Sequence, residues 1–385
     1  MFSATITSLT VLLIVFFLFK EGLGVFNKNP IDEGIVIVTN KNNPVHDFSS
    51  KQLKNIFDQK ITHWNELGGS PDSIILFRLE NITDYYTEAQ IGENFEYLPM
   101  RINQLVDSLP NIIAYFPDNY LAGNFKGNKI HLKNISVSEF FGGKEWLPTA
   151  QPVAQFGVLP LILGTLWVSF GAILLALPLG LAAAVYMSEI ASDNVRKILK
   201  PLIELLAGIP SVVYGFFGLV IIVPLIQQLF NIPVGESALA GSIILGIMAL
   251  PTIITISEDA IRNTPRAMKE ASLALGATKW QTIYKVVVPY SISGISAGAI
   301  LGIGRAIGET MAVLMVTGNA AVIPHTILEP VRTIPATIAA ELGEVAKGGL
   351  HYQALFALGC ILFLITLLIN LTVEFISNKN RYNKQ

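Results

Sequence analysis

The sequence has 385 residues, of which 52% are hydrophobic and only 14% are charged. Its mean hydropathy is +0.54, and these values together are typical of an integral membrane protein. The net charge of −2 at pH 7 gives no indication of nucleic acid as a partner. The single cysteine, Cys360, excludes a disulfide within the chain.

Six apolar stretches are long enough to cross a membrane, since a spanning helix needs about 20 apolar residues. They cover approximately residues 4–19, 157–187, 202–230, 238–258, 291–317 and 351–376. A cleaved signal peptide is the alternative interpretation of the first stretch. That stretch, however, begins without Lys or Arg, and no small-residue cleavage site follows it.

Lys and Arg gather in three segments that fall on one side of the membrane if all six stretches span it. These are Arg196, Lys197 and Lys200; Arg262, Arg266, Lys269, Lys279 and Lys285; and Lys379, Arg381 and Lys384. We expect the protein to lie in the plasma (inner) membrane. Because excess Lys and Arg marks the cytoplasmic side, both termini should lie in the cytoplasm. The polar residues 27–153 would then lie outside.

The outer stretch has the pattern of a small α/β domain. The segments GIVIVTN (34–40) and SIILFR (73–78) are short and β-branched, which predicts strands. Residues 48–57 have helical spacing after an Asn-Pro turn, with Ser49 or Ser50 as the N-cap.

The segment between the fourth and fifth stretches is expected to be a short helix outside the bilayer. Small residues recur there at spacings of four, three and four and should share one helix face: Ala267, Ala271, Ala274 and Thr278. Small side chains on that face would let another surface come close.

The same segment also contains charged residues and two residues that interrupt helices, a glycine and a proline. Arg262, Arg266 and Lys269 line a different face, and Glu258 stands four residues before Arg262, a spacing at which helical side chains pair. Gly276 is expected to bend the chain. Pro289 cannot lie in a regular helix interior without losing a hydrogen bond.

The fifth stretch carries an arginine and a glutamate. Four- and three-residue spacings should place the following residues within a helical stripe of about 80°: Gly294, Gly298, Gly302, Arg305 and Glu309. A lone Arg at the bilayer centre costs about 2.5–3.5 kcal/mol, so we expect Arg305 to face a partner helix or a cavity. Two interpretations follow. Arg305 and Glu309 form a closed pair that holds the bundle together, or Arg305 lines an anion pathway and Glu309 modulates it. Guanidinium geometry suits bidentate contact with phosphate.

The third stretch contains helix-weakening residues, Gly208, Pro210, Gly215 and Gly218. Gly208 and Pro210 are candidates for a hinge or kink beside a water-lined cavity. Ordinary close packing of helices through small residues is the alternative.

The loop also carries a family resemblance. Glu270, Ala271 and Gly276, followed by Val286, Val288 and Pro289, match the pattern E-A-A, three residues, G, nine residues, I-x-L-P. That pattern is typical of the cytoplasmic coupling loop of ABC importer permeases, which this segment resembles. Ser272 replaces the second Ala, and Val replaces Ile and Leu. GRAIGETMAVLMVTGN (304–319) and AGIPSVVYGFFGL (207–219) resemble phosphate importer permeases, the PstC type more than the PstA type.

The resemblance covers about residues 155–376 and the first span, and it implies a mainly α, six-transmembrane, type I (MetI-like) permease with an extracytoplasmic α/β insert. The expected parts are a first transmembrane helix (1–26), the insert (27–153), a permease core (154–377) with its coupling loop (259–289), and a cytoplasmic tail (378–385). The coupling helix is expected at about 259–282.

The insert has a resemblance of its own. Residues 43–69 are similar to a segment of PstS-like periplasmic phosphate-binding proteins, and the similarity extends weakly to Arg78 and residues 111–121. In that family a Gly-Ser-Gly-Thr-like loop after the Arg cradles phosphate. Here the loop is residues 79–83, and Glu80 would repel an anion. The resemblance favours a docking or spacing module over an independent phosphate site.

By the same resemblance the partners are a PstA-like permease, two PstB-like ATPase subunits and a PstS-like binding protein, with phosphate as cargo and lipid around the spans. ATP and Mg²⁺ would bind the ATPase partner, because the chain has no G-x-x-x-x-G-K-[ST] motif. We expect no cofactor, no metal site and no catalytic residue in this chain. A permease for sulphate or molybdate, a phosphate sensor without transport and a phosphoesterase remain as alternatives.

Overall fold

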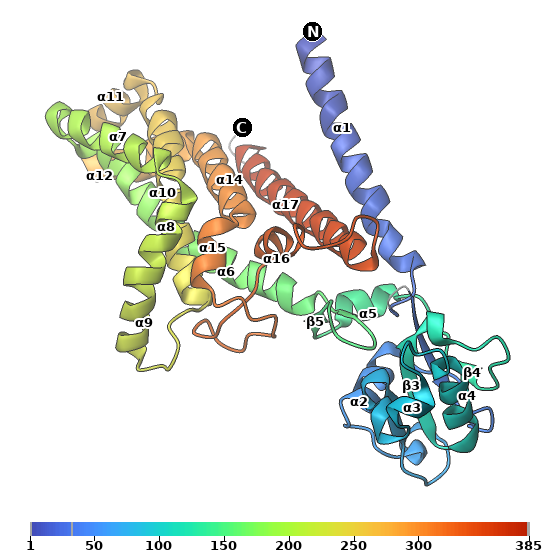
Figure 1. Cartoon of the computed structure of the whole chain (residues 1–385). Coiled ribbons are helices and arrows are strands. Elements are labelled where there is room, and N and C mark those ends of the chain that lie inside the picture. The colour runs from blue at the N-terminus through green and yellow to red at the C-terminus, as the bar shows by residue number, and fades with distance from the viewer. Residues whose placement is uncertain (1, 32–33, 383–385) are drawn as a thin grey trace. The chain divides into compact units, whose positions relative to one another are not determined.

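The structure is a computed structural model, and it describes residues 2–31 and 34–382. The chain divides into two compact units (Figure 1). The helical unit comprises Met1–Gly22, Leu159–Lys347 and Leu355–Gln385, and the α/β unit comprises Leu23–Val158 and Gly348–Ala354.

The α/β unit is built on a four-stranded sheet of order β2-β3-β1-β4. Strand β3 (Ile112–Pro117) runs antiparallel to β1 (Ile35–Thr39) and parallel to β2 (Ile75–Arg78), and β4 (Asn128–Lys129) pairs with β1. The two predicted strands are thus confirmed as β1 and β2. The predicted helix is α2 (Ser50–Phe57), and Ser49 is its N-cap, since its side chain accepts a hydrogen bond from the backbone N–H of Gln52.

The two faces of this sheet bury different helices. Successive strand residues point to opposite faces, so Ile37 packs in the core beneath α2, whereas Val38 packs in the core beneath α4 (Leu98–Ser108). Trp64 and Phe77 are fully buried, one in each core. Smaller elements complete the unit: α3 (Glu88–Ile91), α5 (Val137–Gly142), the hairpin of β5 (Trp146–Leu147) with β6 (Gln155–Phe156), and 3-10 helices at Gly24–Asn27, Trp64–Leu67, Leu79–Asp84 and Asp118–Tyr120.

The helical unit contains the remaining helices. They are α1 (Phe2–Leu23), α6 (Leu159–Val185), α7 (Asp193–Gly208), α8 (Ser211–Phe217), α9 (Val223–Phe230), α10 (Ala238–Arg262), α11 (Arg266–Ala274), α12 (Lys279–Thr282), α13 (Val288–Tyr290), α14 (Ile292–Gly308), α15 (Met311–Val316), α16 (Ile334–Glu341) and α17 (Leu350–Tyr382). Three π-helical turns interrupt or extend them, at Tyr186–Ile190, Gly218–Ile222 and Ile283–Val287.

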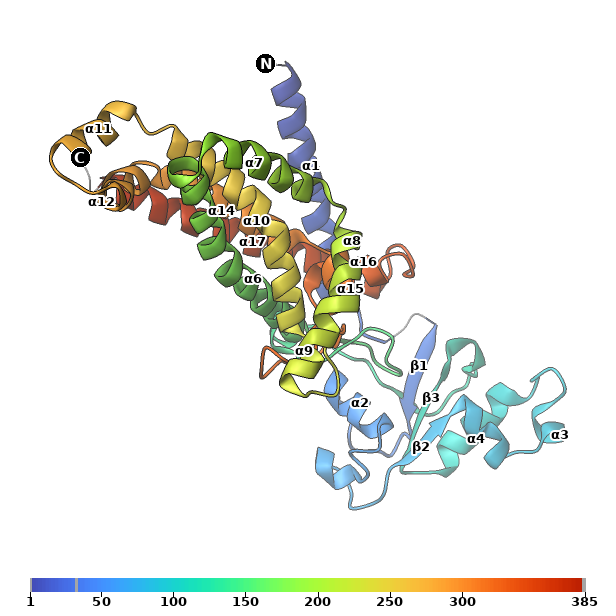
Figure 2. The same cartoon turned by 90° about the vertical axis from the view of Figure 1, so that its left-hand side faces the viewer.

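Among the described residues, five helices are long and apolar enough to cross a membrane, and a bent pair supplies a sixth. The five are Thr5–Asn27, Leu159–Ile190, Ser211–Phe230, Ala238–Arg262 and Leu350–Phe375; the pair is Lys279–Tyr290 with Ile292–Gly308, bent by 69°. The expected mainly α, multi-pass architecture is therefore confirmed. Helices α7, α11 and α12 lie at one end of the helical unit, with α9 at the other (Figure 2).

The third span begins later than predicted. The sequence suggested residues 202–230, but the apolar span starts at Ser211, and residues 193–208 form the separate helix α7. Pro210 lacks an N–H and disfavours helical backbone at the residue before it, so the chain breaks at Ile209. The charged residues of α7 make it a polar-edged helix rather than part of a span.

The fifth span is also interrupted. Helix α14 ends at Gly308, and Glu309 has extended backbone angles of φ −73° and ψ 133° before α15 begins at Met311. The prediction that Glu309 shares a helical stripe with Arg305 is therefore wrong, because the helix stops one residue before Glu309. Glycines at 304 and 308 weaken this end of the helix.

Close packing of α10 against α6 and α14 forms the centre of the helical unit. Figures 1 and 2 show these helices side by side. The predicted glycine stripe of α14 faces α10: a Cβ at Gly302 would lie 2.6 Å from Ile253, and one at Gly294 would collide with Ala260. The expectation that these glycines permit close helix contact is confirmed.

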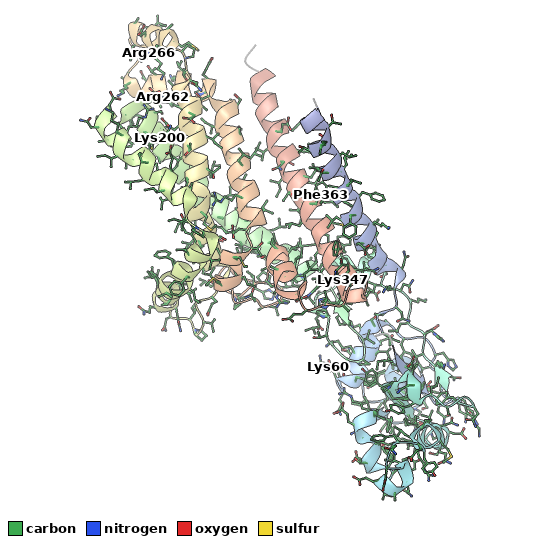
Figure 3. All side chains as sticks on the ribbon, turned by 45° about the horizontal axis from the view of Figure 1, so that its top comes forward. Lys60, Lys200, Arg262, Arg266, Lys347 and Phe363 are labelled. Atoms are coloured by element: carbon green, nitrogen blue, oxygen red, sulfur yellow. The ribbon has the colours of Figure 1, made fainter. Side chains whose placement is uncertain are left out.

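Two further features fix the edges of the unit. Helix α1 packs on α17 through aromatic pairs, among them Phe19 with Phe363, whose ring centroids are 6.1 Å apart (Figure 3). The sequence analysis did not predict α16, whose first N–H, that of Ile334, donates to Thr165 Oγ1 on α6 at 2.9 Å. At eight residues, α16 is too short to give a spanning signal.

Candidate translocation and coupling site

The segment after α10 is a short exposed helix followed by a bend. Helix α11 (Arg266–Ala274) has no buried residue, and Gly276 follows it with φ +82°, a left-handed conformation that glycine adopts without strain. The predicted bend is present, but the helix expected at about residues 259–282 is not continuous, because α10 ends at Arg262, α11 covers only Arg266–Ala274 and α12 begins at Lys279. Thr278, however, does not share a face with the small residues of α11, because it is the N-cap of α12.

The small-residue face is exposed, and bulky apolar side chains surround it. Ala267, Ala271, Ala274 and Glu270 are all exposed. Four larger side chains that the sequence analysis did not single out project from the same segment: Met268, Leu273, Leu275 and Trp280, which we call the loop patch. Leu275 is 90% exposed and Trp280 63% exposed. Met268, Leu273 and Leu275 lie outside the candidate spans, whereas Trp280 lies in Lys279–Tyr290, the first part of the bent pair.

Polar contacts hold α11 to the helical unit. Lys269 forms an ion pair with Glu189 in the π-helical turn after α6. Ser272 Oγ and Thr282 Oγ1 are 3.0 Å apart, and Thr264 and Ser291 make a similar hydroxyl contact at 3.0 Å. The loop is thus tied both to the end of α6 and to the start of α14.

Pro289 lies in α13, which is followed at Ser291 by the 69° bend into α14. Pro289 lies just after the π-helical turn Ile283–Val287, next to the end of the helix Lys279–Tyr290. The loop therefore joins α14 through a sharp corner.

Glu258 pairs with other residues than the sequence suggested. Instead of contacting Arg262 four residues on, its fully buried carboxylate lies 3.1 Å from Arg196 Nη2 and 2.9 Å from Lys200 Nζ, both on α7. Lys200 also reaches Asp259 at 3.3 Å. The hydrogen bond to Glu258 raises the pKa of Lys200 above its ordinary value. Lys200, Arg262 and Arg266 lie at the same end of the unit (Figure 3).

Arg305 lies half-buried near the end of α14, and Glu309, also half-buried, follows the helix. Both residues are described, and no ion pair joins them. Tyr214 on α8 packs in the same core cluster as Ala306, the residue that follows Arg305 in α14. The Tyr214 hydroxyl donates to the backbone oxygen of Leu206 at 2.8 Å.

This hydrogen bond spans the break at which Gly208 ends α7 and Pro210 precedes α8. Arg305, Tyr214 and the break therefore gather in one region. Sequence reasoning found Arg305 and the break but missed Tyr214, because the contact joins segments about ninety residues apart and no local spacing reveals it.

A second ion pair was not anticipated. Arg332 Nη1 lies 2.8 Å from Glu341 Oε1, across the length of α16, and both side chains are mostly buried. It anchors the short helix to the chain before it.

In the α/β unit, the residues aligned with a phosphate cradle are arranged differently. Arg78 Nη2 donates to the backbone oxygen of Phe57 at 3.2 Å, and its guanidinium lies over the Phe57 ring at 5.7 Å. The loop after it is a 3-10 helix, Leu79–Asp84, in which Glu80 is exposed. Arg78 thus has intramolecular partners, and a carboxylate follows it where a binding protein has a glycine-rich loop.

Comparison with known proteins agrees with this division. The family model of the binding-protein-dependent transport system inner membrane component matches residues 176–382, and a PBP superfamily domain matches residues 25–88. The first match spans more than half of the chain. The protein is an integral membrane permease, and it belongs to the family of binding-protein-dependent transport system inner membrane components.

Several named relatives are similar to the chain. It is 39% identical to the phosphate transport system permease protein PstC of Mesorhizobium japonicum over 264 residues, covering 64% of this chain and 79% of the relative. It is 34% identical to PstC 1 of Mycobacterium tuberculosis, covering 61% and 80%. It is also 41% identical to the probable ABC transporter permease protein YqgH of Bacillus subtilis, covering 66% and 83%.

The solved structures that match the chain are more distant from it in sequence. An inward-facing MetNI methionine ABC transporter chain is 17% identical, with a TM-score of 0.46, and covers 58% of this chain and 95% of that one. A substrate-binding protein of a phosphate ABC transporter from Clostridium perfringens is 24% identical, with a TM-score of 0.20, and covers 29% and 50%.

Proposed function

We propose that this chain is the permease subunit of an ATP-driven phosphate importer and forms the translocation pathway for inorganic phosphate. The observation that carries the proposal is the 34–39% identity to PstC proteins over most of those proteins' length. The exposed helix and loop patch support it, because a coupling surface for an ATPase has to project from the spans. The alternative is that a permease of the same fold transports another oxyanion, sulphate or molybdate.

The proposed assembly contains a PstA-like permease, two PstB-like ATPase subunits and a PstS-like binding protein. ATP and Mg²⁺ belong to the ATPase subunits, and this chain is not itself an enzyme and holds no cofactor. The loop patch, with Glu270, Ala271, Gly276 and Pro289 around it, docks on the ATPase. Basic residues concentrated at the end of the unit that carries α7 and α11 support a cytoplasmic position for that end and for both termini in the plasma membrane.

Arg305 provides the anion contact in the pathway. A half-buried guanidinium without a carboxylate partner keeps its donors available for phosphate oxygens. Alternating access then exposes Arg305 first to one side of the membrane and then to the other. Glu309 lies close in sequence, just past the end of α14, where it can influence Arg305 without neutralising it through a helical i, i+4 contact.

The α/β unit serves as a docking or spacing module for the binding protein. Arg78 is occupied within the unit, and Glu80 places a negative charge in the loop after it. An independent phosphate site would need these donors free.

The test is transport by the assembled complex. This chain, the PstA-like permease, the ATPase subunits and the binding protein are reconstituted together in vesicles. The entry of radiolabelled phosphate is then followed with and without ATP. We expect ATP-dependent entry that excess sulphate or molybdate does not inhibit. Inhibition by either would reassign the cargo, and signalling without entry would favour a sensor. Release of phosphate from a phosphoester would favour an enzyme.

A further inference from the structure

Helix α7 is held to the helical unit mainly by charge. None of its residues is buried, and its apolar side chains Ile198 and Leu205 are 64% and 69% exposed. By contrast, Arg196 and Lys200, one helical turn apart, both reach the end of α10. Because side chains four residues apart share a face, these two cations form one edge of α7.

The carboxylate that they reach is fully buried. Glu258 Oε2 accepts a hydrogen bond from Lys200 at 2.9 Å, and Asp259 lies 3.3 Å from Lys200. Oε1 lies 3.1 Å from Arg196 Nη2 in an ion pair but accepts no hydrogen bond. A buried carboxylate is strongly unfavourable without its partners, so Glu258 depends on these two cations. We call these four residues the α7 latch.

The latch lies on the path between the loop patch and Arg305. Glu258 is four residues from the end of α10 at Arg262, after which α11 begins at Arg266. A short non-helical turn, residues 263–265, joins the two helices, and the hydroxyl contact of Thr264 with Ser291 ties this turn to the start of α14. Movement of the exposed loop can reach the carboxylate through this turn and the last helical turn of α10.

The other end of the path is the break after α7. Gly208 ends the helix, and the Tyr214 hydroxyl crosses the break to the oxygen of Leu206 at 2.8 Å. Tyr214 packs in the core cluster that also contains Ala306, the neighbour of Arg305 in α14. A displacement of α7 relative to α10 would therefore change the backbone at the break and the surroundings of Arg305.

We propose that the α7 latch transmits the movement of the ATPase-docking loop to the break at Gly208–Pro210, and that Glu258 is its positioning residue. This inference rests on the proposed function. It assigns to Arg196, Lys200 and Glu258 a role in coupling ATP hydrolysis to phosphate entry, separate from docking by the loop and from anion contact by Arg305.

The test compares variants on one helix in the reconstituted complex. Lys200→Met removes one cation from Glu258 and leaves Arg196 in place, and Glu258→Gln keeps the side-chain shape. Lys197→Met is the matched control, since Lys197 is exposed on the same helix. Lys200→Arg keeps the charge. Phosphate entry and ATP hydrolysis are measured in the same vesicles, together with recovery of all subunits.

We expect phosphate entry per ATP hydrolysed to fall at least about fivefold in Lys200→Met and Glu258→Gln. The complex should still assemble and hydrolyse ATP, and Lys197→Met and Lys200→Arg should keep the wild-type ratio. A parallel loss of entry, hydrolysis and subunit recovery would make the latch purely structural, and an unchanged ratio would also overturn the inference.

If wild-type vesicles show no ATP-dependent phosphate entry, the proposed function itself fails, and the latch fails with it.

Discussion

Arg305 is the residue on which the proposed contact with phosphate depends. It lies half-buried close to the end of α14, and no ion pair joins it to Glu309 in the described part of the chain. Of the two interpretations that the sequence left open, a closed pair between these residues is absent from this structure. The arrangement favours a guanidinium that is available to an anion.

Replacing Arg305 with Gln should therefore lower phosphate entry by about 10- to 100-fold, since hydrogen bonds to charged groups are worth about 1.5–3 kcal/mol. Arg305→Lys should give an intermediate rate, because it keeps the charge and loses the planar fork. The measurement is entry into vesicles normalised to recovered complex. Entry at the wild-type rate in Arg305→Gln would remove this residue from the pathway.

The glycines of α14 allow a comparison within one helix. A Cβ at Gly294 would collide with Ala260 on α10, whereas nothing lies within 4 Å of one at Gly304. Gly294→Ala should therefore lower stability by about 1–3 kcal/mol through overpacking. Gly304→Ala should be neutral or stabilising by up to about 1 kcal/mol, because Ala is the better helix former.

Thermal unfolding of the purified protein measures both variants. Ala260→Gly should rescue Gly294→Ala by removing the opposing methyl group. Equal melting temperatures for Gly294→Ala and Gly304→Ala would mean that α10 and α14 do not pack as described.

At the scale of elements, the loop from α11 to α13 combines exposure with anchoring. Its bulky side chains project outward, while Lys269 pairs with Glu189 and Ser272 contacts Thr282. Such a segment can transmit force, because Lys269 fixes it to the end of α6 and Thr264, just before it, contacts Ser291 at the start of α14, while its outer face remains open. The proposal assigns that face to the ATPase.

Leu275→Glu should reduce co-purification of the ATPase by at least about tenfold, since losing a central apolar anchor typically costs 2 kcal/mol or more. Gly276→Pro should act similarly, because proline fixes φ near −65° and Gly276 requires +82°. Glu270→Lys, at an exposed site on α11, is expected to weaken docking as well. Leu147→Glu, an exposed leucine of the α/β unit, is the control. Unchanged recovery of ATPase with Leu275→Glu would refute docking at the loop patch.

Much of the element pattern could be predicted because its physical signals are local. Spans need about 20 apolar residues, β1 and β2 are β-branched, and Ser49 precedes its helix. Features set by distant contacts could not be predicted. Glu258 has a suitable cation four residues away in sequence, yet it pairs with α7, some sixty residues earlier. Helix α16 is too short to give a hydropathy signal.

In the candidate site too, local backbone features could be predicted from the sequence, whereas contacts between distant segments could not. The bend at Gly276 and the break between Gly208 and Pro210 follow from backbone chemistry, and both are present. The stripe through Glu309 failed because spacing rules assume a helix that continues, whereas α14 stops at Gly308. Tyr214 was missed because only the fold places it near Arg305.

At the scale of the whole molecule, the chain joins a permease family domain to a unit that contains a PBP superfamily match. The α/β unit has its own sheet and two cores, one on each face. Its Arg78 is bound to Phe57, so the proposal gives this unit a docking or spacing role.

Arg78→Ala should accordingly leave the KM for phosphate entry unchanged within about twofold. It should destabilise the α/β unit by roughly 1–2 kcal/mol, because it removes a hydrogen bond and a cation–π contact. Fluorescence of the buried Trp64 and Trp146 can follow unfolding of this unit. A tenfold rise in KM would instead place phosphate binding in the α/β unit.

We propose that the loop patch faces the cytoplasm, where an ATPase can reach it, and that the α/β unit is exposed outside. Cys360 is the only cysteine, so Cys360→Ser gives a background in which single cysteines can be labelled. Lys279→Cys beside the patch and Lys60→Cys in the α/β unit, both at exposed positions, are treated with a membrane-impermeant thiol reagent in intact cells. We expect Lys60→Cys to be labelled at once and Lys279→Cys only after permeabilisation. Labelling of Lys279→Cys in intact cells would contradict it.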